Sequence, residues 1–246
     1  MTEEERFKKR LNNLIDDAYS GKLVLLPFMD TAAQELVKYS LKHNEPIQPY
    51  FYGGTTNSEY KRAIYYYEKP DDSMFEIAKL KINYSKLNGS INHRSILGSA
   101  LGLGLKREVI GDIVSYNDSY YIMVDAKLKG FIIDNLNYVG RVPIKLEEID
   151  YKIENQNKYL NKTCFLASLR IDVVIAGFYN LSRKDAQEMI KDGLVKINHK
   201  ECLNVSLMLK ENDVLSVRGK GRLIVDAVGG KTKSGNLVVE LKKPID

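Results

Sequence analysis

The alternation of apolar and polar residues predicts mixed helices and strands along the whole chain. An opening helix that ends near Gly21 is predicted from apolar residues at helical spacing, namely Phe7, Leu11, Leu14, Ile15 and Ala18. A second helix from Ala32 to His43 follows a cap at Asp30 or Thr31, and strands are predicted over 47–52 and 62–67. Residues 1–72 therefore form a predicted small α/β unit.

The next block has the order strand, helix, two strands, helix, strand. The predicted ranges are 75–82, 93–103, 113–116, 120–124, 127–137 and 142–149. Asn117 and Asp118 separate the two middle strands and indicate a hairpin. The order β-α-β-β-α-β predicts a central RRM-like, or split-βαβ, domain over residues 73–150. The helix at 127–137 is expected to turn one apolar face inward, made of Leu128, Phe131, Ile132 and Leu136.

Two tyrosines and three glycines of this central block could belong to an RNA-binding or a dinucleotide-binding site. Tyr120 and Tyr121 could stack on RNA bases, as aromatic side chains do in RRM domains, or could simply pack in the sheet. The basic and glycine residues of an RNP1 pattern are missing. Gly98, Gly102 and Gly104 lie within or at the end of a helix, which argues against a dinucleotide-binding loop. The interpretation adopted for these glycines is close packing of the helix on the sheet.

The segment 169–222 carries the most specific pattern. A helix is followed by a second helix that Ser182 caps, with Asp185 three residues later. Arg183 and Lys184 then lie in the first turn, where exposed N–H groups and the helix dipole favour a phosphate. A short alternating strand follows Gly193, and a later strand runs into Arg218-Gly219-Lys220-Gly221-Arg222. These glycines are expected to let the backbone approach a phosphate closely.

The stretches SLRIDVVIAGF, LSRKDAQEMIKDGLVKINHK and KENDVLSVRGKGR resemble the RNA-binding domain first defined in ribosomal protein S4. The resemblance implies an S4-type domain over residues 163–246 and the α+β fold class for the whole chain. The RNA-facing positions that it implies are Arg170, Ser182, Arg183, Lys184, Gln187, Lys191, Asn198, Arg218, Lys220 and Arg222.

The distribution of charge agrees with that resemblance. The net charge is +5, and residues 163–246 carry 14 Lys and Arg against 10 Asp and Glu, whereas residues 1–162 carry 23 against 22. The basic excess thus lies in the segment expected to bind RNA. No apolar run is long enough for a membrane span, and no signal-peptide pattern follows the start. Cys164 and Cys202 lack metal-type spacing and are expected to be reduced thiols, so no metal or cofactor is expected.

Three phrases in a fixed order extend the resemblance to nearly the whole chain. They are LPFMDTAAQELV, HRSILGSALGLGLKREVIGDI and the S4-type segment, and together they resemble the YlmH family of bacterial RNA-binding proteins. The resemblance implies a cytoplasmic protein, often encoded among cell-division genes, that binds rRNA and tRNA on the large ribosomal subunit with stalled peptidyl-tRNA. It further implies a role in quality control through C-terminal alanine tailing of the nascent chain. A monomer is expected, with no membrane or DNA partner.

An enzyme is the weaker alternative. Arg170-Ile171-Asp172 superficially resembles the motif around the catalytic aspartate of a pseudouridine synthase, but the large catalytic domain that should follow is absent. No GxSxG, P-loop or HExxH pattern occurs in the sequence. No catalytic residue is therefore expected. A recycling or stress factor for rRNA or tRNA, and a division scaffold with secondary RNA contact, remain open alternatives.

Overall fold

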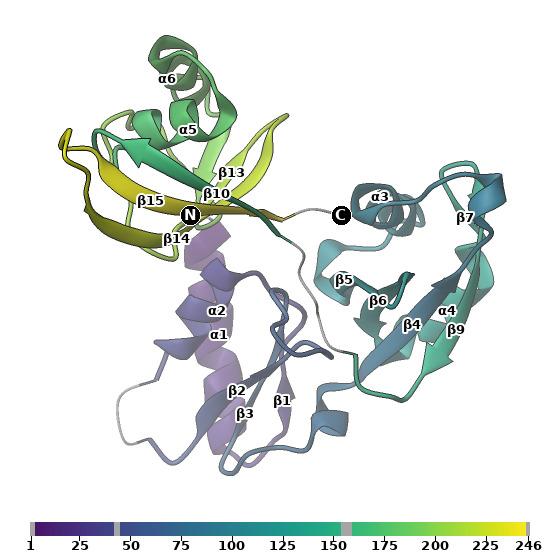
Figure 1. The fold of residues 1–246 in the computed structure, drawn as a ribbon. Helices are drawn as coiled ribbons and strands as arrows, with labels where there is room; N and C mark the ends of the chain where they lie inside the picture. The colour runs from purple at the N-terminus through teal and green to yellow at the C-terminus, as the bar shows by residue number, and fades with distance from the viewer. Residues whose placement is uncertain (1–2, 42–44, 154–158, 245–246) are drawn as a thin grey trace. The chain divides into compact units, whose positions relative to one another are not determined.

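The computed structural model describes residues 3–41, 45–153 and 159–244, in which helices and strands alternate along the chain (Figure 1). These residues fall into two compact units, 3–153 and 159–244. The α+β fold class is confirmed. The first unit holds both predicted N-terminal blocks, and the boundary predicted near residue 72 stays a prediction. Within the described ranges, none of the helices combines the length and apolar character that crossing a membrane requires.

The N-terminal part of the first unit is a three-stranded antiparallel sheet with two helices. Its elements are α1 (Glu3–Tyr19), β1 (Val24–Leu25), α2 (Thr31–Lys38), β2 (Gln48–Tyr52) and β3 (Arg62–Tyr66), with the strand order β1-β3-β2. Helix α1 buries Leu11, Ile15 and Ala18 in one core with Tyr65, as its apolar spacing predicts. Gly21 follows the helix with φ 86°, so the predicted end of α1 is confirmed.

Helix α2 begins at its predicted cap but ends earlier than predicted. The Asp30 side chain accepts a hydrogen bond from the backbone N–H of Ala33. The last helical residue is Lys38, and the predicted end at His43 lies outside the described residues. Ser40 Oγ donates to the Val37 carbonyl at 2.6 Å and also bonds Tyr65 Oη, so a side chain competes with the backbone where the helix stops.

The central part of the unit has the predicted β-α-β-β-α-β order. Its elements are η1 (Asp72–Phe75), β4 (Ile77–Asn83), η2 (Lys86–Asn88), α3 (His93–Gly102), η3 (Arg107–Val109), β5 (Ile110–Tyr116), β6 (Ser119–Asp125), η4 (Ala126–Leu128), α4 (Lys129–Asn135), β7 (Tyr138–Val139), β8 (Val142–Pro143) and β9 (Lys145–Ile149). The strand order is β5-β6-β4-β9, all antiparallel. Asn117 and Asp118 both have positive φ, which is the backbone that a two-residue hairpin turn requires.

The predicted inward face of the helix at 127–137 is wrong at Phe131 alone, because Leu128, Ile132 and Leu136 contact the core, and the prediction for the glycines of α3 is wrong. Phe131 is 46% exposed, whereas Ile132 and Leu136 are buried, because a seven-residue helix turns only a narrow stripe towards the sheet. Gly98 and Gly102 were expected to pack on the sheet, but both lie on the exposed face of α3. A Cβ atom at either glycine would meet nothing within 4 Å. Close packing of the helix therefore does not explain them.

One face of the central sheet packs against the N-terminal part of the same unit. Phe28 and Ile153 lie in one buried cluster with Tyr121 and Met123, and Tyr60 packs against this cluster. Tyr121 is 3% exposed, and its hydroxyl lies 3.1 Å from the hydroxyl of Tyr151. Sheet packing, rather than stacking on RNA bases, agrees with the burial of Tyr121. Tyr120 packs, partly buried, against the core under the helices.

Two buried charged groups join the N-terminal and central parts. The Arg62 guanidinium, 6% exposed, donates to the carbonyls of Leu26 and Glu76 and lies 3.4 Å from the Asp125 carboxylate. The Asp112 carboxylate accepts the backbone N–H groups of Glu59 and Tyr60, at 2.7 and 3.0 Å. Burial raises the pKa of Asp112, although these backbone donors oppose the shift. Arg62 thus contacts polar atoms of both parts, and Asp112 of the central part binds backbone donors of the N-terminal part.

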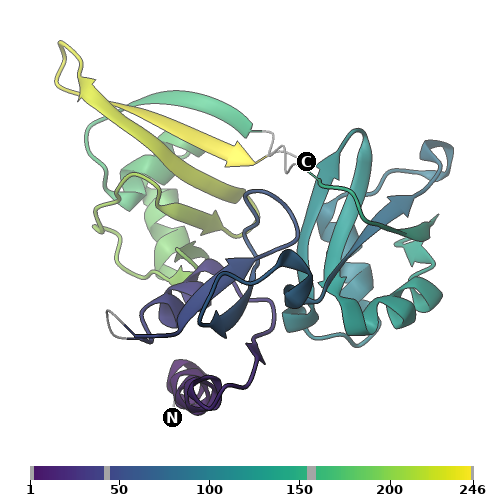
Figure 2. The same cartoon turned by 90° about the horizontal axis from the view of Figure 1, so that it is seen from below.

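The second unit is one six-stranded sheet covered on one face by two helices (Figures 1 and 2). Its elements are β10 (Tyr159–Leu166), α5 (Ile171–Tyr179), α6 (Arg183–Lys191), β11 (Val195–Ile197), β12 (Lys200–Glu201), β13 (Val214–Val217), β14 (Gly221–Lys231) and β15 (Leu237–Pro244). The strand order is β10-β15-β14-β13-β11-β12. The segment after Val225 completes the sheet, and its strand β15 pairs with both β14 and β10.

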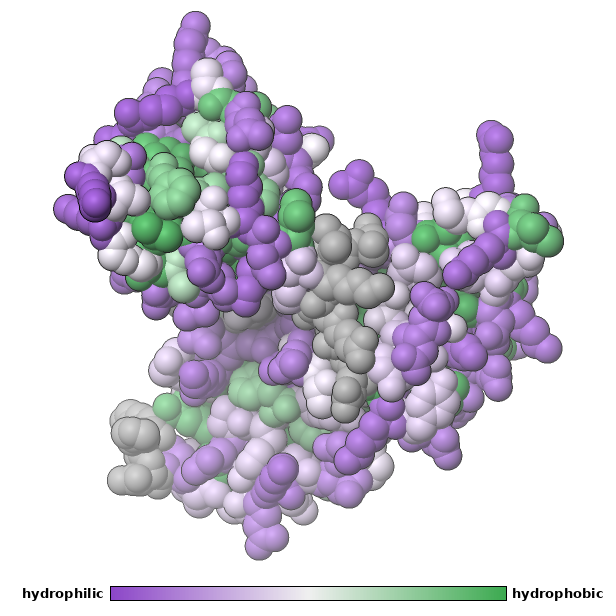
Figure 3. Space-filling model, viewed as in Figure 1, coloured by the Kyte–Doolittle hydropathy of each residue, from purple (hydrophilic) through white to green (hydrophobic). Residues whose placement is uncertain are grey.

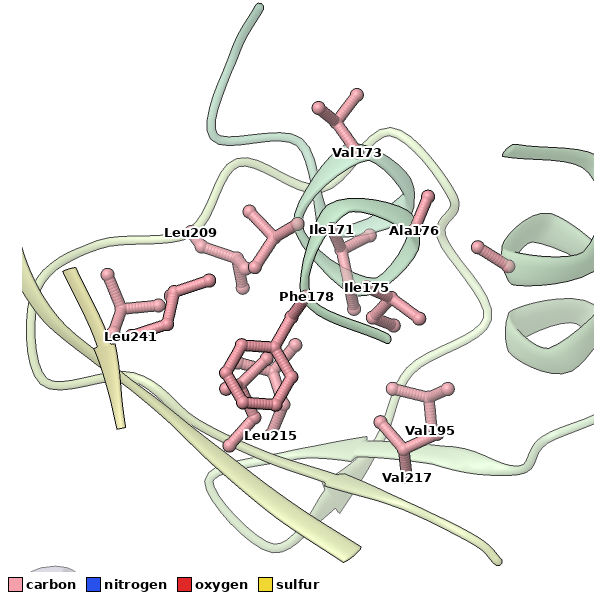
Figure 4. Packing of buried hydrophobic residues seen from close by; sticks show 14 of the residues in the cluster. Ile171, Val173, Ile175, Ala176, Phe178, Val195, Leu209, Leu215, Val217 and Leu241 are labelled. Atoms are coloured by element: carbon pink, nitrogen blue, oxygen red, sulfur yellow. The ribbon is translucent and has the colours of Figure 1, made fainter. Parts of the chain in front are cut away.

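Helix α5 lies at the centre of this unit. Figure 4 shows Ile171, Ile175 and Phe178 of α5 among the apolar side chains of the strands, which include Leu215, Val217 and Leu241. Lys162 of β10 caps the C-terminal end of α5 by donating to the carbonyls of Gly177 and Phe178. In the view of Figure 3, apolar residues gather over β10 and β15 and hydrophilic side chains surround them. Cys164 and Cys202 are free cysteines, and both are buried.

We expect Arg62→Ala to lower the free energy of unfolding of the first unit by about 3–5 kcal/mol, because it removes the donor to the Leu26 carbonyl, one of two donors to the Glu76 carbonyl and the ion-pair partner of the partly buried Asp125 carboxylate. The matched control is Lys127→Ala, which removes an exposed ion pair with Glu76 and is expected to cost less than about 1 kcal/mol. Urea unfolding of both variants measures the difference. Equal decreases in the free energy of unfolding of the two variants would contradict a structural role for Arg62.

Candidate RNA-binding surface

The start of helix α6 presents two exposed cations in its first turn. Ser182 has extended backbone angles, and its hydroxyl accepts the N–H of Asp185 at 3.0 Å, so the predicted cap is confirmed. Arg183 and Lys184 follow in the first turn with side chains 59% and 85% exposed. Lys184 lies 3.9 Å from Glu188, one turn along the same helix. A phosphate at this end would meet two cations and the positive end of the helix dipole.

A buried carboxylate from α5 stands beneath this helix start. The Asp172 side chain is 0% exposed and accepts two bonds from Arg170, from Nε and Nη2, both at 3.1 Å. Arg183 Nη2 donates to the same carboxylate at 3.0 Å, and Gln187 Nε2 donates at 2.7 Å. Three of the ten predicted RNA-facing side chains therefore meet at one residue that the prediction left out.

The donors keep Asp172 ionised. Burial would raise the pKa of this carboxyl group, but the hydrogen bonds from Arg170, Gln187 and Arg183 outweigh burial and lower the pKa to about 2. The ordinary value is 3.8, so the folded state binds this proton less tightly than the unfolded state. The resulting stabilisation is complete above about pH 4 and is lost as the pH falls through about 2.

The basic turn between β13 and β14 lies at the other end of α6. The backbone N–H of Arg218 donates to the carbonyl of Leu194, which follows the C-terminal end of that helix. Arg218 and Lys220 are exposed, and Arg222 is half-buried opposite Ser216 on the neighbouring strand. Lys191 is exposed in the last turn of α6. A nine-residue helix is about 13 Å long, so the cations form two groups separated by roughly that distance.

Asn198 takes part in the hairpin that joins β11 and β12. It has φ 47°, and its amide donates to Asp213 at 2.9 Å while its amide oxygen accepts the N–H of Val214 at 2.9 Å. Both polar ends of the side chain are therefore engaged within the domain. Its contact with RNA stays a prediction, as do the contacts of the other nine residues.

The sequence contains a signal for the structural role of Asp172. From the sequence alone, this residue is related only to a motif of pseudouridine synthases. Asp172 falls in the first turn of a helix whose other positions are almost all apolar. A carboxylate there must be compensated by donors from elsewhere in the fold. Among the described residues, no group of three or more His, Cys, Asp or Glu side chains is arranged to hold a metal ion.

Comparison with known proteins assigns the class. Residues 169–215 match the S4 domain model, and residues 70–153 match the model described as a putative RNA-binding domain in YlmH. The fold and the site thus define an S4-domain RNA-binding protein. The chain is 32% identical over 243 residues to the ribosome-associated protein quality control protein P2 of Bacillus subtilis (strain 168), with 93% of each chain covered. It belongs to the YlmH family, as its sequence motifs indicated.

A solved structure supports the same relationship. The cell division protein ylmH from Streptococcus pneumoniae is 28% identical to this chain, with a TM-score of 0.52. The match covers 61% of this chain and 93% of that chain.

The geometry of the basic turn changes the expectation for its glycines. Gly219 and Gly221 have φ 79° and 99°, a backbone region that costs a residue with a side chain about 1–2 kcal/mol. We therefore expect Gly219→Val and Gly221→Val each to lower the thermal stability of the second unit. Gly230→Val is the control, because Gly230 has no positive φ and a Cβ there would meet nothing within 4 Å. Unchanged melting of the two turn variants would mean that the glycines serve close approach of RNA alone.

Proposed function

We propose that this protein is a non-enzymatic factor that binds the large ribosomal subunit carrying stalled peptidyl-tRNA and supports C-terminal alanine tailing of the nascent chain. The observation that carries the proposal is the pair of cationic groups at the two ends of α6, on a domain of the S4 class. The name of the Bacillus relative, a ribosome-associated quality control protein, supports the ribosomal setting. We further propose that it acts in the cytoplasm as a monomer.

The chemistry of the surface favours RNA backbone as the ligand. Arg183 and Lys184 at one end, and Arg218 and Lys220 at the other, are exposed cations that suit phosphate groups. Contacts of this kind fix a protein on a folded RNA without reading its sequence. Such binding fits rRNA or tRNA whose shape, rather than sequence, marks the site. The first unit then selects the ribosomal state through protein contact or shape.

The roles of the two units are separable under this proposal. The central sheet buries Tyr121 and Met123 on the face that RRM domains use for bases. The principal RNA contact is therefore assigned to the second unit. A division scaffold with secondary RNA contact would instead bind its partner with little dependence on salt.

The experiment is a salt series of affinities for purified large subunits with and without peptidyl-tRNA. Arg183→Glu with Lys184→Glu is expected to weaken binding about 100-fold and to reduce the slope of log affinity against log salt by about one to two, because two phosphate contacts become repulsive. The matched control is Lys231→Glu with Lys233→Glu, which makes the same charge change at the exposed tip between β14 and β15.

The outcomes separate the alternatives. Weaker binding of large subunits by the α6 variant, together with unchanged binding by the tip variant, supports the assigned surface. Equal losses would indicate long-range attraction without a defined site. Unchanged affinity of the α6 variant, or affinity of the wild type that ignores salt, would overturn RNA binding through this surface.

A further inference from the structure

We infer that Asp172 is a positioning residue that holds the guanidinium groups of Arg170 and Arg183 ready for RNA phosphates. The inference rests on the proposed RNA-binding function. Asp172 does not itself touch RNA, because its side chain is 0% exposed beneath the start of α6. It acts through the two arginines and Gln187, which reach the surface from both helices.

Four hydrogen bonds from three side chains hold the Asp172 carboxylate. Oδ1 accepts Arg170 Nε, and Oδ2 accepts Arg170 Nη2, Arg183 Nη2 and Gln187 Nε2. One donor therefore contacts Oδ1 and three contact Oδ2, so both carboxylate oxygens are engaged within the domain. The paired bonds from Arg170 fix the plane of that guanidinium as a bidentate contact does.

The arginines keep donors for a ligand. Each guanidinium carries five N–H groups, and these bonds use two nitrogens of Arg170 and one of Arg183. Their side chains are 34% and 59% exposed, so the outer edges face solvent. An arginine side chain loses rotamer entropy when a phosphate holds it, and a side chain that is already ordered loses less.

The sign of the effect distinguishes positioning from simple charge. A negative carboxylate near a phosphate site repels the phosphate, so on Coulomb attraction alone its neutralisation would tighten RNA binding. If Asp172 positions the arginines, its neutralisation loosens them and weakens RNA binding. The two accounts therefore predict opposite changes for one substitution.

The test compares Asp172→Asn with Asp185→Asn in the full chain, using purified large subunits at a fixed salt concentration. Asp185 is an exposed carboxylate in the first turn of α6, two residues from Arg183, so its substitution removes the same charge near the same site. We expect Asp172→Asn to weaken binding about 5- to 20-fold and Asp185→Asn to leave it unchanged or slightly tighter. Binding of a folded Asp172→Asn variant as tight as wild type would overturn the inference.

A double-mutant cycle separates positioning from general damage to the fold. In an Arg183→Ala background, the effect of Asp172→Asn should shrink, because one of the side chains it positions is gone. An effect of the same size in both backgrounds would overturn the inference. If the wild type itself shows no affinity for large subunits, the proposed function fails and not the positioning.

If the Asp172→Asn variant does not fold, a measurement on the wild-type protein still tests the inference. NMR relaxation of arginine Nε–H groups reports their order on the picosecond-to-nanosecond timescale. We expect Arg170 Nε–H to be ordered without RNA and Arg218 Nε–H to be mobile. Equal mobility of the two groups would overturn positioning, whatever the affinity for RNA.

Discussion

The second unit depends on the compensation of one buried charge. Helix α5 buries seven of its nine residues, and six of those seven are apolar. The seventh is Asp172, and an ionised carboxylate can stay in such a core only if it is fully hydrogen-bonded. Its donors come from the residue before α5 and from α6, so the charge ties the second helix to the first. The hydrogen bonds between Asp172 and α6 thereby also fix where the cations at the start of α6 reach the surface.

The first unit uses buried charges in a comparable way. Arg62 and Asp112 are satisfied largely by backbone groups that lie on both sides of the junction between its N-terminal and central parts. Arg107 adds to this junction, because its guanidinium lies 3.6 Å from the ring centroid of Tyr60. Once these contacts form, the sheet face with Tyr121 is part of a core. The sheet face that an RRM domain uses to bind RNA is therefore used here for packing against the N-terminal part of the unit.

The features that the sequence predicted well are those with local causes. The cap at Ser182 and the turn at Asn117-Asp118 follow from backbone preferences of a few adjacent residues. The strand-helix order of the central part follows from apolar periodicity in the same way. The family resemblance also rested on motifs that are contiguous in the sequence, and the comparisons confirm it.

The features that the sequence missed depend on contacts between distant residues. The role of Asp172 needs donors up to 15 positions away, and the exposure of Gly98 and Phe131 depends on which side of a helix meets the sheet. The end of α2 depends on a bond from Ser40 to Tyr65, 25 positions along the chain. The placement of the two cationic groups at opposite ends of α6 likewise needs the bond from Arg218 to Leu194. Periodicity alone contains none of these pairings.

The most direct test of the ribosomal role is co-sedimentation of the tagged protein with ribosomal subunits from cells. The wild type is compared with a variant in which Arg183, Lys184, Arg218 and Arg222 are all changed to Glu. We expect the wild type to travel with large subunits that contain tRNA and the variant to stay at the top of the gradient. Wild-type protein that remains at the top, or a variant that still travels with large subunits, would contradict it.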